Sequence, residues 1–456
     1  MGNEIFTLEP QEVPYVSTKY RKICTQIPVP ESIPILERLR KVEPLSMTGQ
    51  PPILWDKAQG INVFDPYGNI FLDFSSGVLV TNAGHARKEI CDAIIAQVNH
   101  GLIHNYCFPS ELRLHACEKI LSIAPSYLKK VFMLTTGAEA TECALKLART
   151  WGHRTGKQKN IIISFENAFH GRTLGSQMMG GSPALKDWIV NLDPDIIQVP
   201  FPDGFYNENI NFSLFEQTLK QKNINPENVC GVITESYQGG GADFFPMDYV
   251  QKLRKWCDAH QSLLIFDEVQ AGFGRTGKMF AFQNYNVEAD LVCMGKGISS
   301  GLPVSGVLGR QEIMDQYPPG SMTSTHSGNP LCCASVIANI DLIMKEKLVE
   351  NAAKLGEIFQ KELQKIVCDY EIIGSCHGKG LVAGLQVVQP NTTTPDKVTA
   401  NRICEKAIQQ GLMMFAPVGK ATLKLAPPLC ITEDALREGC AVLHDAIGEV
   451  ECKECE

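Results

Sequence analysis

The feature that most constrains this chain is a series of short, almost wholly apolar segments spaced along its middle. They are four to seven residues long and are bounded by polar loops: 161–165, 229–235, 263–267 and 291–294. Runs of this length without polar alternation are typical of strands buried on both faces, as in parallel sheets. The chain is therefore expected to build a mainly parallel sheet.

Segments with the 3.6-residue spacing of helices separate and follow these strands. The expected helices are 90–100, 138–150, 247–260, 329–346 and 354–366. The second of them, AEATECALKLART, is rich in residues that favour helix interiors. Alternating strands and helices predict an α/β fold with helices flanking the sheet. After about residue 370 the elements become shorter, which predicts a second, smaller α+β domain.

The length of 456 residues suits about three domain-sized units. We expect an N-terminal arm and strands joining the small domain over 1–70, a large domain over 71–330, and a small domain over 331–456. Two strands, 61–65 and 70–73, should flank a turn at Pro66-Tyr67-Gly68-Asn69.

Composition excludes several functions. Lys and Arg number 42 against 50 Asp and Glu, and no basic block stands out, so we expect no nucleic-acid binding. No apolar run reaches 18 residues and the N-terminus lacks a signal-peptide core, so we expect a cytoplasmic protein without membrane contact. The 17 scattered cysteines indicate a reducing compartment. Cys452 and Cys455 lack further ligands, so no metal site is expected.

Asp267 ends an apolar segment, which is where α/β sheets place ligands. Taken alone, it could simply be a solvated strand end. A nucleotide hydrolase is another reading, because Gly272 to Lys278 matches G-x-x-x-x-G-K. Met279, however, stands where that loop needs a hydroxyl for magnesium. The motif also starts five residues after Asp267, so the two cannot lie on separate strands. The hydrolase reading is therefore disfavoured.

Lys296 lies just beyond the apolar segment 291–294. Burial lowers the pKa of a lysine and yields a nucleophilic amine, which suits a Schiff base with a carbonyl such as pyridoxal phosphate. That cofactor also needs a carboxylate, an aromatic ring and backbone N–H groups. Asp267, Phe169 and the helix start at 135–139 are candidates. Taken singly, each candidate is weak evidence for a cofactor site, because a helix start of this kind is usually only a cap and the segment around Phe169 is usually only a loop.

Taken together, several segments resemble the class III aminotransferases, pyridoxal-phosphate enzymes of fold type I. They are Gly84-His85, TTGAEATECALKLAR (135–149), AFHGRT (168–173), ESYQGG (235–240), LLIFDEVQAGFGRTGKMFAFQ (263–283), GKGISSGLPVSGVLGR (295–310), THSGNPLCCAS (325–335) and KLAPPL (424–429). The resemblance covers about residues 50–445. Within the class, the chain is most similar to the branch that acts on ω-amino acids such as 4-aminobutyrate, taurine and β-alanine.

The resemblance implies roles for residues around the cofactor ring. Lys296 would form the Schiff base with the cofactor and shuttle the proton. Asp267 would pair with the pyridinium nitrogen and keep it protonated. Gln270 would contact the phenolic oxygen, and Phe169 would stack on the ring, with His170 beside it among the cofactor-binding residues.

The resemblance also implies a phosphate site and a shared assembly. Gly137 and Ala138 would hold the phosphate through backbone N–H groups. Thr325, helped by Ser324, would reach the phosphate of the neighbouring subunit. A homodimer with shared active sites is thus expected, with a tetramer as the alternative.

For the substrate, the resemblance points to Arg172 as the anchor of the donor's distal acid group and includes Val78 among the substrate-binding residues. Two positions depart from the ω-amino acid branch. Lys424 replaces the arginine that binds the α-carboxylate of the 2-oxo acid, and Gly240 replaces the glutamate that covers it. Ser236 also replaces a usual proline. A lysine ammonium is a point charge, whereas an arginine guanidinium binds a carboxylate through two N–H groups. The carboxylate of the 2-oxo acid would therefore be held differently.

The expected function is an aminotransferase that moves an amino group from a 4-aminobutyrate-, β-alanine- or taurine-like donor to a 2-oxo acid, 2-oxoglutarate or pyruvate. The alternatives are an aminomutase or decarboxylase of the same fold, a diamine aminotransferase, and an inactive binding scaffold. The intact pair of Lys296 and Asp267 argues against the scaffold.

Overall fold

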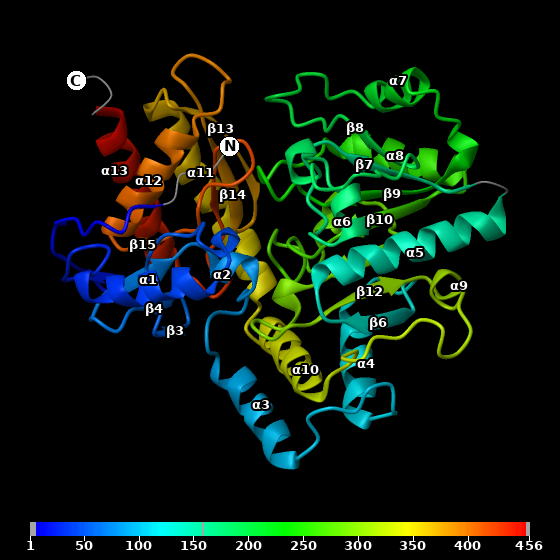
Figure 1. The fold of residues 1–456 in the computed structure, drawn as a ribbon, viewed down its shortest axis with the longest axis horizontal. Coiled ribbons are helices and arrows are strands. Elements are labelled where there is room, and N and C mark those ends of the chain that lie inside the picture. Colours follow the sequence, from blue (N-terminus) through cyan, green and yellow to red (C-terminus); the bar gives the residue numbers. More distant parts are fainter. Residues whose placement is uncertain (1–5, 157–158, 453–456) are drawn as a thin grey trace. The chain divides into compact units, whose positions relative to one another are not determined.

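The computed structural model describes residues 6–156 and 159–452, so Cys455 lies outside the described residues. The chain divides into two compact units. The central unit spans 88–350, and the flanking unit combines 1–87 with 351–456. Figure 1 shows the ribbon of both.

A seven-stranded sheet forms the centre of the central unit, in the order β6-β12-β11-β10-β9-β7-β8. Its strands are β6 Lys130–Leu134, β7 Ile161–Phe165, β8 Ile196–Val199, β9 Val229–Glu235, β10 Leu263–Asp267, β11 Leu291–Met294 and β12 Ser305–Gly309. Within this sheet β12 runs antiparallel to both neighbours, and the other strands are parallel. Every residue of β9, β10, β11 and β12 is buried. The mainly parallel sheet expected from the sequence is confirmed.

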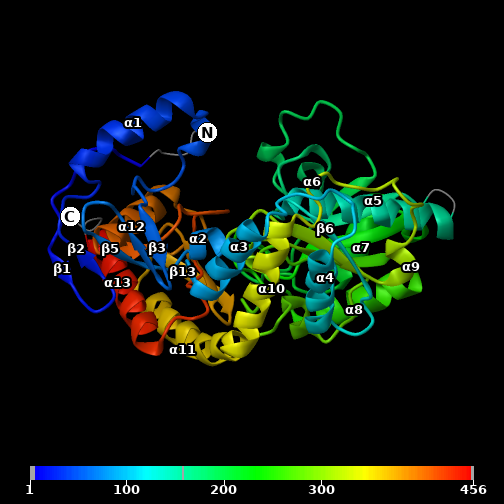
Figure 2. The same cartoon turned by 90° about the horizontal axis from the view of Figure 1, so that it is seen from below.

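Helices cover this sheet and extend from it. They are α3 Lys88–His100, α4 Glu111–Ile123, α5 Gly137–Thr155, α6 Leu174–Met179, α7 Ser213–Gln221, α8 Met247–Ala259, α9 Gln311–Met314 and α10 Pro330–Lys345. Helix α5 packs along the sheet against β12, β11 and β9 through its apolar face, which includes Ala144, Leu147 and Ala148. Helices α3 and α4 pack against α10 (Figure 2).

The flanking unit holds two smaller sheets and is the expected α+β part. One sheet contains β1 Val16–Ser17, β2 Lys22–Ile23, β3 Lys57–Gln59, β4 Asn62–Phe64, β5 Ile70–Asp73 and β15 Leu412–Met413; the other contains β13 Ile373–Lys379, β14 Val382–Val387 and β16 Thr422–Leu425. Its helices are α1 Ile33–Val42, α2 Ser76–Leu79, most of α11 Leu348–Asp369, α12 Lys397–Gln409 and α13 Glu433–Cys452. Strands β4 and β5 pair antiparallel around the expected turn.

Short 3-10 turns complete the list: η1 Pro30–Ser32, η2 Leu45–Met47, η3 Pro183–Leu185, η4 Pro226–Asn228, η5 Ala281–Tyr285 and η6 Lys296–Ile298. Within residues 6–156 and 159–452, no helix has the length and apolar character needed to cross a bilayer.

The last turn of α5 makes a close approach that requires glycine. A Cβ on Gly152 would lie 2.1 Å from the carbonyl oxygen of Lys159 and 2.5 Å from Cβ of Cys230. We expect Gly152→Ala to lower the free energy of unfolding by about 1–3 kcal/mol, since backbone cannot move aside cheaply. Gly156→Ala is the control, because the nearest atom to its Cβ would be Lys159 Cδ at 3.4 Å, which is an ordinary contact distance. Denaturant titration of both variants measures this, and equal stabilities would contradict the clash.

Candidate active site

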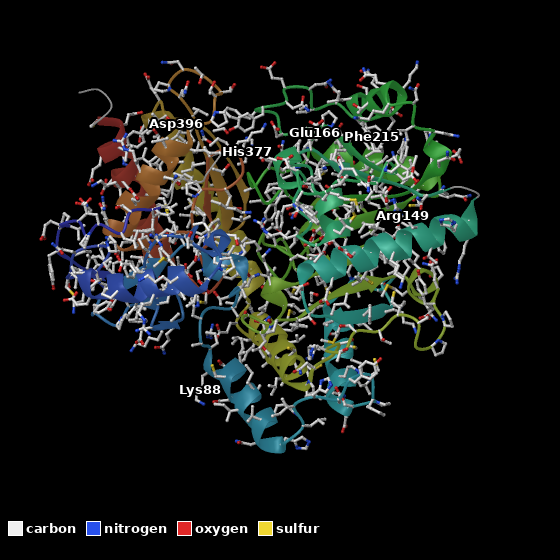
Figure 3. All side chains as sticks on the ribbon, in the orientation of Figure 1. Lys88, Arg149, Glu166, Phe215, His377 and Asp396 are labelled. Atoms are coloured by element: carbon white, nitrogen blue, oxygen red, sulfur yellow. The ribbon has the colours of Figure 1, made fainter. Side chains whose placement is uncertain are left out.

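Three strands of the central sheet bring chemically active residues to one edge. β9 ends at Glu235, β10 ends at Asp267, and β11 leads through Gly295 to Lys296. Glu235 and Asp267 are partners in the parallel register of β9 and β10. Carboxyl ends of parallel strands lie at the same edge, which is the usual ligand site of such sheets. Glu166, labelled in Figure 3, follows β7 at this edge.

A buried pair of Asp267 and His170 fixes the carboxylate. His170 Nδ1 lies 2.8 Å from Asp267 Oδ2, and the backbone N–H of Val269 donates to Asp267 Oδ1 over 3.0 Å. Burial lowers the pKa of His170, but its hydrogen bond to Asp267 and the charges of Asp267 and Glu235 outweigh this and raise it overall. The hydrogen bonds to His170 and to the backbone N–H of Val269 therefore hold the carboxylate of Asp267 in place.

Lys296 begins the turn η6 and is mostly buried. Its φ of 45° lies in the left-handed region, which a non-glycine residue adopts at a cost. The side chain of Asn339 holds this turn by donating to the carbonyl oxygens of Gly297 and Ile298, each over 2.9 Å. Burial lowers the pKa of Lys296, although Asp267 and Glu235 oppose the shift. A lowered pKa leaves more of the neutral, nucleophilic amine.

The start of helix α5 suits a phosphate. Glu139 closes a capping box by accepting from the N–H groups of Thr135 and Thr136 over 2.9 and 2.8 Å. Among the described residues, the next two N–H groups, of Gly137 and Ala138, have no acceptor. A Cβ on Gly137 would lie 2.8 Å from Val269 Cγ1, so only glycine fits. Such a helix start attracts anions through its N–H groups and dipole.

The loop carrying Phe169 and His170 is seated on this helix start. Thr141 Oγ1 donates to the carbonyl oxygen of His170 over 2.7 Å. A Cβ on Gly171, whose φ is 137°, would lie 2.7 Å from Cβ of Ala138. The ring of Phe169 is 37% exposed, and the guanidinium carbon of Arg172 lies 5.6 Å from its centroid. The aromatic ring and the arginine therefore lie together beside the start of α5.

Sequence reasoning missed two residues of this site. Glu235 lies beside Gln270, because a Cβ on Gly239 would be 2.8 Å from both Glu235 Oε1 and Gln270 Nε2. Val269 packs between Gly137 and Gly295, at 2.8 and 3.0 Å from the Cβ positions that those glycines lack. The strand-end argument that found Asp267 applies equally to Glu235, whereas no pattern in the sequence marks Val269.

The other expected site residues lie elsewhere. Thr325 is exposed and Ser324 half-buried in the loop before α10, and Ser327 Oγ ties that loop to the carbonyl oxygen of Met133 over 2.6 Å. Val78 and Lys424 belong to the flanking unit. Val78 is 42% exposed in a left-handed turn with a φ of 63°, and Lys424 is buried in β16.

The residues of the central unit fit the chemistry of pyridoxal phosphate. They offer an amine of lowered pKa, a carboxylate fixed by a buried imidazole, an exposed aromatic ring and N–H groups without protein acceptors at a helix start. These are the groups that such a cofactor requires of its protein.

Comparison with known proteins identifies the family. Residues 46–447 match the family model described as aminotransferase class-III. The chain therefore belongs to the class III aminotransferases, and it is a pyridoxal-phosphate-dependent enzyme of fold type I. It is 32% identical to a probable 4-aminobutyrate aminotransferase of Bacillus subtilis, over 85% of this chain and 91% of that protein. A transaminase structure from Virgibacillus has a TM-score of 0.84 at 27% identity, covering 92% of this chain and 99% of that one.

Relatives of similar identity are named for different reactions. The ornithine aminotransferase of Emericella nidulans is 33% identical over 88% of this chain and 87% of its own. The alanine/serine racemase of Pyrococcus horikoshii is 31% identical over 98% of both chains. The family thus fixes the cofactor and the general chemistry, while the amine substrate depends on residues that differ among its members.

Proposed function

We propose that this protein transfers the amino group of an ω-amino acid, of the 4-aminobutyrate, β-alanine or taurine kind, to a 2-oxo acid such as 2-oxoglutarate or pyruvate. The observation that carries the proposal is the place of Arg172, whose guanidinium lies over the ring of Phe169. A guanidinium at that position can bind the distal acid group of a donor as a bidentate fork. Similarity to a 4-aminobutyrate aminotransferase supports the same substrate class.

Bound pyridoxal phosphate supplies an aldehyde for the amine and a ring that withdraws electrons from the reacting carbon. Lys296 would hold it covalently and, once displaced by the donor, carry the proton at Nζ. Asp267, fixed by His170 and the Val269 N–H, would hold the proton of the ring nitrogen. The hydrogen bond to His170 would keep this carboxylate in place against the ring nitrogen.

The remaining contacts orient the cofactor. The N–H groups of Gly137 and Ala138 would bind its phosphate, because they lack acceptors among the described residues. Phe169 would pack on one face of the ring, and Val269, which packs between Gly137 and Gly295, would pack on the other. Gln270 would donate to the phenolic oxygen. Lys424 would contact the acceptor's carboxylate as a point charge, and Val78 would line the substrate site.

A second candidate function is racemisation, favoured by the full-length similarity to the racemase. A racemase needs no acceptor and regenerates its cofactor in each turnover, whereas an aminotransferase leaves the amino group on the cofactor after the first half-reaction. The two therefore differ when a donor is supplied without any 2-oxo acid.

Borohydride trapping separates these candidates and tests Lys296 at once. In the holoenzyme alone, we expect borohydride to fix the cofactor to Lys296, as read by peptide mass mapping. After an ω-amino acid is added without acceptor, this tag should disappear and pyridoxamine phosphate should accumulate. Lys278→Ala, which removes an exposed lysine near the site in sequence, should behave like the parent. A tag on another lysine refutes the assignment, and a tag that survives the donor favours racemisation.

The anchor role of Arg172 predicts a selective loss. Removing a charge-assisted contact costs about 1.5–3 kcal/mol, or roughly tenfold to a hundredfold. Arg172→Ala should lower kcat/KM by that factor for an acidic donor and far less for a monoamine of equal length. Lys424→Ala is the matched variant, expected to raise the acceptor's KM alone. Equal losses for acidic and plain amines in Arg172→Ala would contradict the anchor.

We also propose a homodimer, on the basis of one exposed apolar patch. The α3–α4 patch consists of Ile95, Val98, Leu102, Ile103, Tyr106, Phe108 and Leu114, which are 36–74% exposed. Tyr106 Oη lies 3.2 Å from Thr323 Oγ1, so the patch adjoins the loop of Ser324 and Thr325. Apolar patches of this kind mark interaction surfaces. A second copy of the chain bound to this patch would lie next to Ser324 and Thr325. These are the residues expected to reach the cofactor phosphate of the neighbouring subunit.

Phe108 is the most exposed member of the patch, at 74%. Phe108→Glu should weaken the dimer at least about tenfold, because aromatic anchors dominate interface energies and a carboxylate there must be desolvated. Sedimentation velocity over a concentration series measures this. Ile210→Glu, at an exposed apolar position before α7, is the control and should leave the dimer intact. An unchanged dimer in Phe108→Glu would exclude this patch as the interface.

A further inference from the structure

Glu235 holds two loops of the site at once. Its carboxylate is buried, and it accepts from the N–H of Phe169 at Oε2 over 3.0 Å and from the N–H of Gly239 at Oε1 over 2.8 Å. Phe169 belongs to the loop seated on α5, and Gly239 belongs to the loop that follows β9. One side chain therefore couples the aromatic ring of the site to a loop from another part of the sheet.

The second of these loops lies against Gln270. A Cβ on Gly239 would be 2.8 Å from Gln270 Nε2 and 3.1 Å from Gln270 Oε1. The N–H bond from Gly239 to Glu235 sets how closely that backbone approaches the amide. Gln238 anchors the same loop from the other side by donating to the carbonyl oxygen of Glu166 over 2.7 Å. Glu235 thus helps to place both Phe169 and Gln270.

Glu235 also belongs to a set of coupled buried charges. Burial raises the pKa of Glu235 to about 7; the charge of His170 lowers it and that of Asp267 raises it. Its own negative charge in turn favours the protonated forms of His170 and Lys296. Tyr237, whose pKa burial raises, faces the same charge. Glu235 therefore acts electrostatically on both His170 and Lys296.

We propose that Glu235 is a positioning residue for the cofactor: its carboxylate fixes the backbones of Phe169 and Gly239 around the ring, and its charge acts on the titratable groups that surround the ring. This rests on the proposed roles of Lys296 and Asp267. A carboxylate that only tied two loops together would affect stability alone. The proposal requires in addition that its charge reach the cofactor.

Glu235→Gln keeps the size of the side chain but removes its charge and turns a donor toward one of the two N–H groups. We expect the dissociation constant for pyridoxal phosphate to rise about tenfold to a hundredfold, as for a lost charge-assisted contact. The midpoint of the pH titration of the bound cofactor's absorbance should move down by about one pH unit, because loss of a nearby anion disfavours protonated forms. Both measurements use holoenzyme and need no substrate.

Glu268→Gln is a matched control. Glu268 is equally buried, follows Asp267 directly, and accepts from the N–H groups of Ala281 and Phe282 over 2.8 and 2.7 Å. Burial raises its pKa to about 7 as well. Glu235, however, contributes to the pKa shifts of His170 and Lys296, whereas Glu268 contributes to neither. Glu268→Gln should cost stability but leave the titration midpoint within about 0.3 of the parent value.

Glu235→Asp separates the two parts of the role. The charge remains but the shorter side chain can reach only one N–H, so the midpoint should stay while cofactor affinity falls several-fold. If Glu235→Gln fails to fold, Glu235→Asp provides the test. The proposal is then wrong if Glu235→Asp binds the cofactor as tightly as the parent, or if the midpoint of its absorbance titration moves. If Glu235→Gln folds and binds the cofactor like the parent, or if Glu268→Gln shifts the midpoint equally, the proposal is wrong. A borohydride tag still on Lys296 in these variants shows that the proposed function stands independently.

Discussion

The site depends on the burial of carboxylates at the ends of apolar strands. A buried carboxylate is costly unless hydrogen bonds and charges compensate it. Asp267 is compensated by His170 and the Val269 N–H, and Glu235 by two backbone N–H groups. Each compensating donor lies in a loop, so satisfying the carboxylates dictates where the loops go. The electrostatics of the strand ends thereby shape the surroundings of the cofactor.

Glu268, which directly follows Asp267, is a third buried carboxylate compensated in the same way. It receives two backbone N–H groups of the turn η5 and the hydroxyl of Ser236. The resemblance to the class III aminotransferases leads one to expect proline at the position of Ser236, and proline has no side-chain donor. In this chain the departure adds a hydrogen bond to a buried acid, and the bond ties the segment after β9 to the segment after β10.

The sequence predicted those parts of the structure that follow from continuous apolar burial. Strands β7, β9, β10 and β11 begin and end where their apolar runs do, because a strand buried on both faces needs apolar residues throughout. The antiparallel direction of β12 could not be predicted, since periodicity carries no direction. The structure also argues against the nucleotide-hydrolase interpretation, which requires the glycine-rich loop to open an α-helix. After β10 the chain instead runs through turns into η5.

The contacts that define the site were harder to foresee, because they join residues far apart in sequence. The pairing of His170 with Asp267 spans 97 positions, and that of Phe169 with Glu235 spans 66. A sequence motif can identify each residue of such a pair without showing that the two residues are in contact. Val269 illustrates the limit, since its importance comes only from its place between Gly137 and Gly295.

Cofactor chemistry and substrate choice have different structural origins in this protein. The groups proposed to face the cofactor stand on strand ends and on the start of α5, where burial and register leave little freedom. The groups proposed to face the substrate stand on loops or in the flanking unit: Arg172 is exposed, Val78 lies in a left-handed turn, and Gly240 occupies a loop that elsewhere carries a glutamate. Loops accept substitutions at lower cost than buried strands. Relatives named for different amines can therefore share one fold, and the proposed substrate of this chain depends on Arg172 and Lys424 rather than on the seven-stranded sheet.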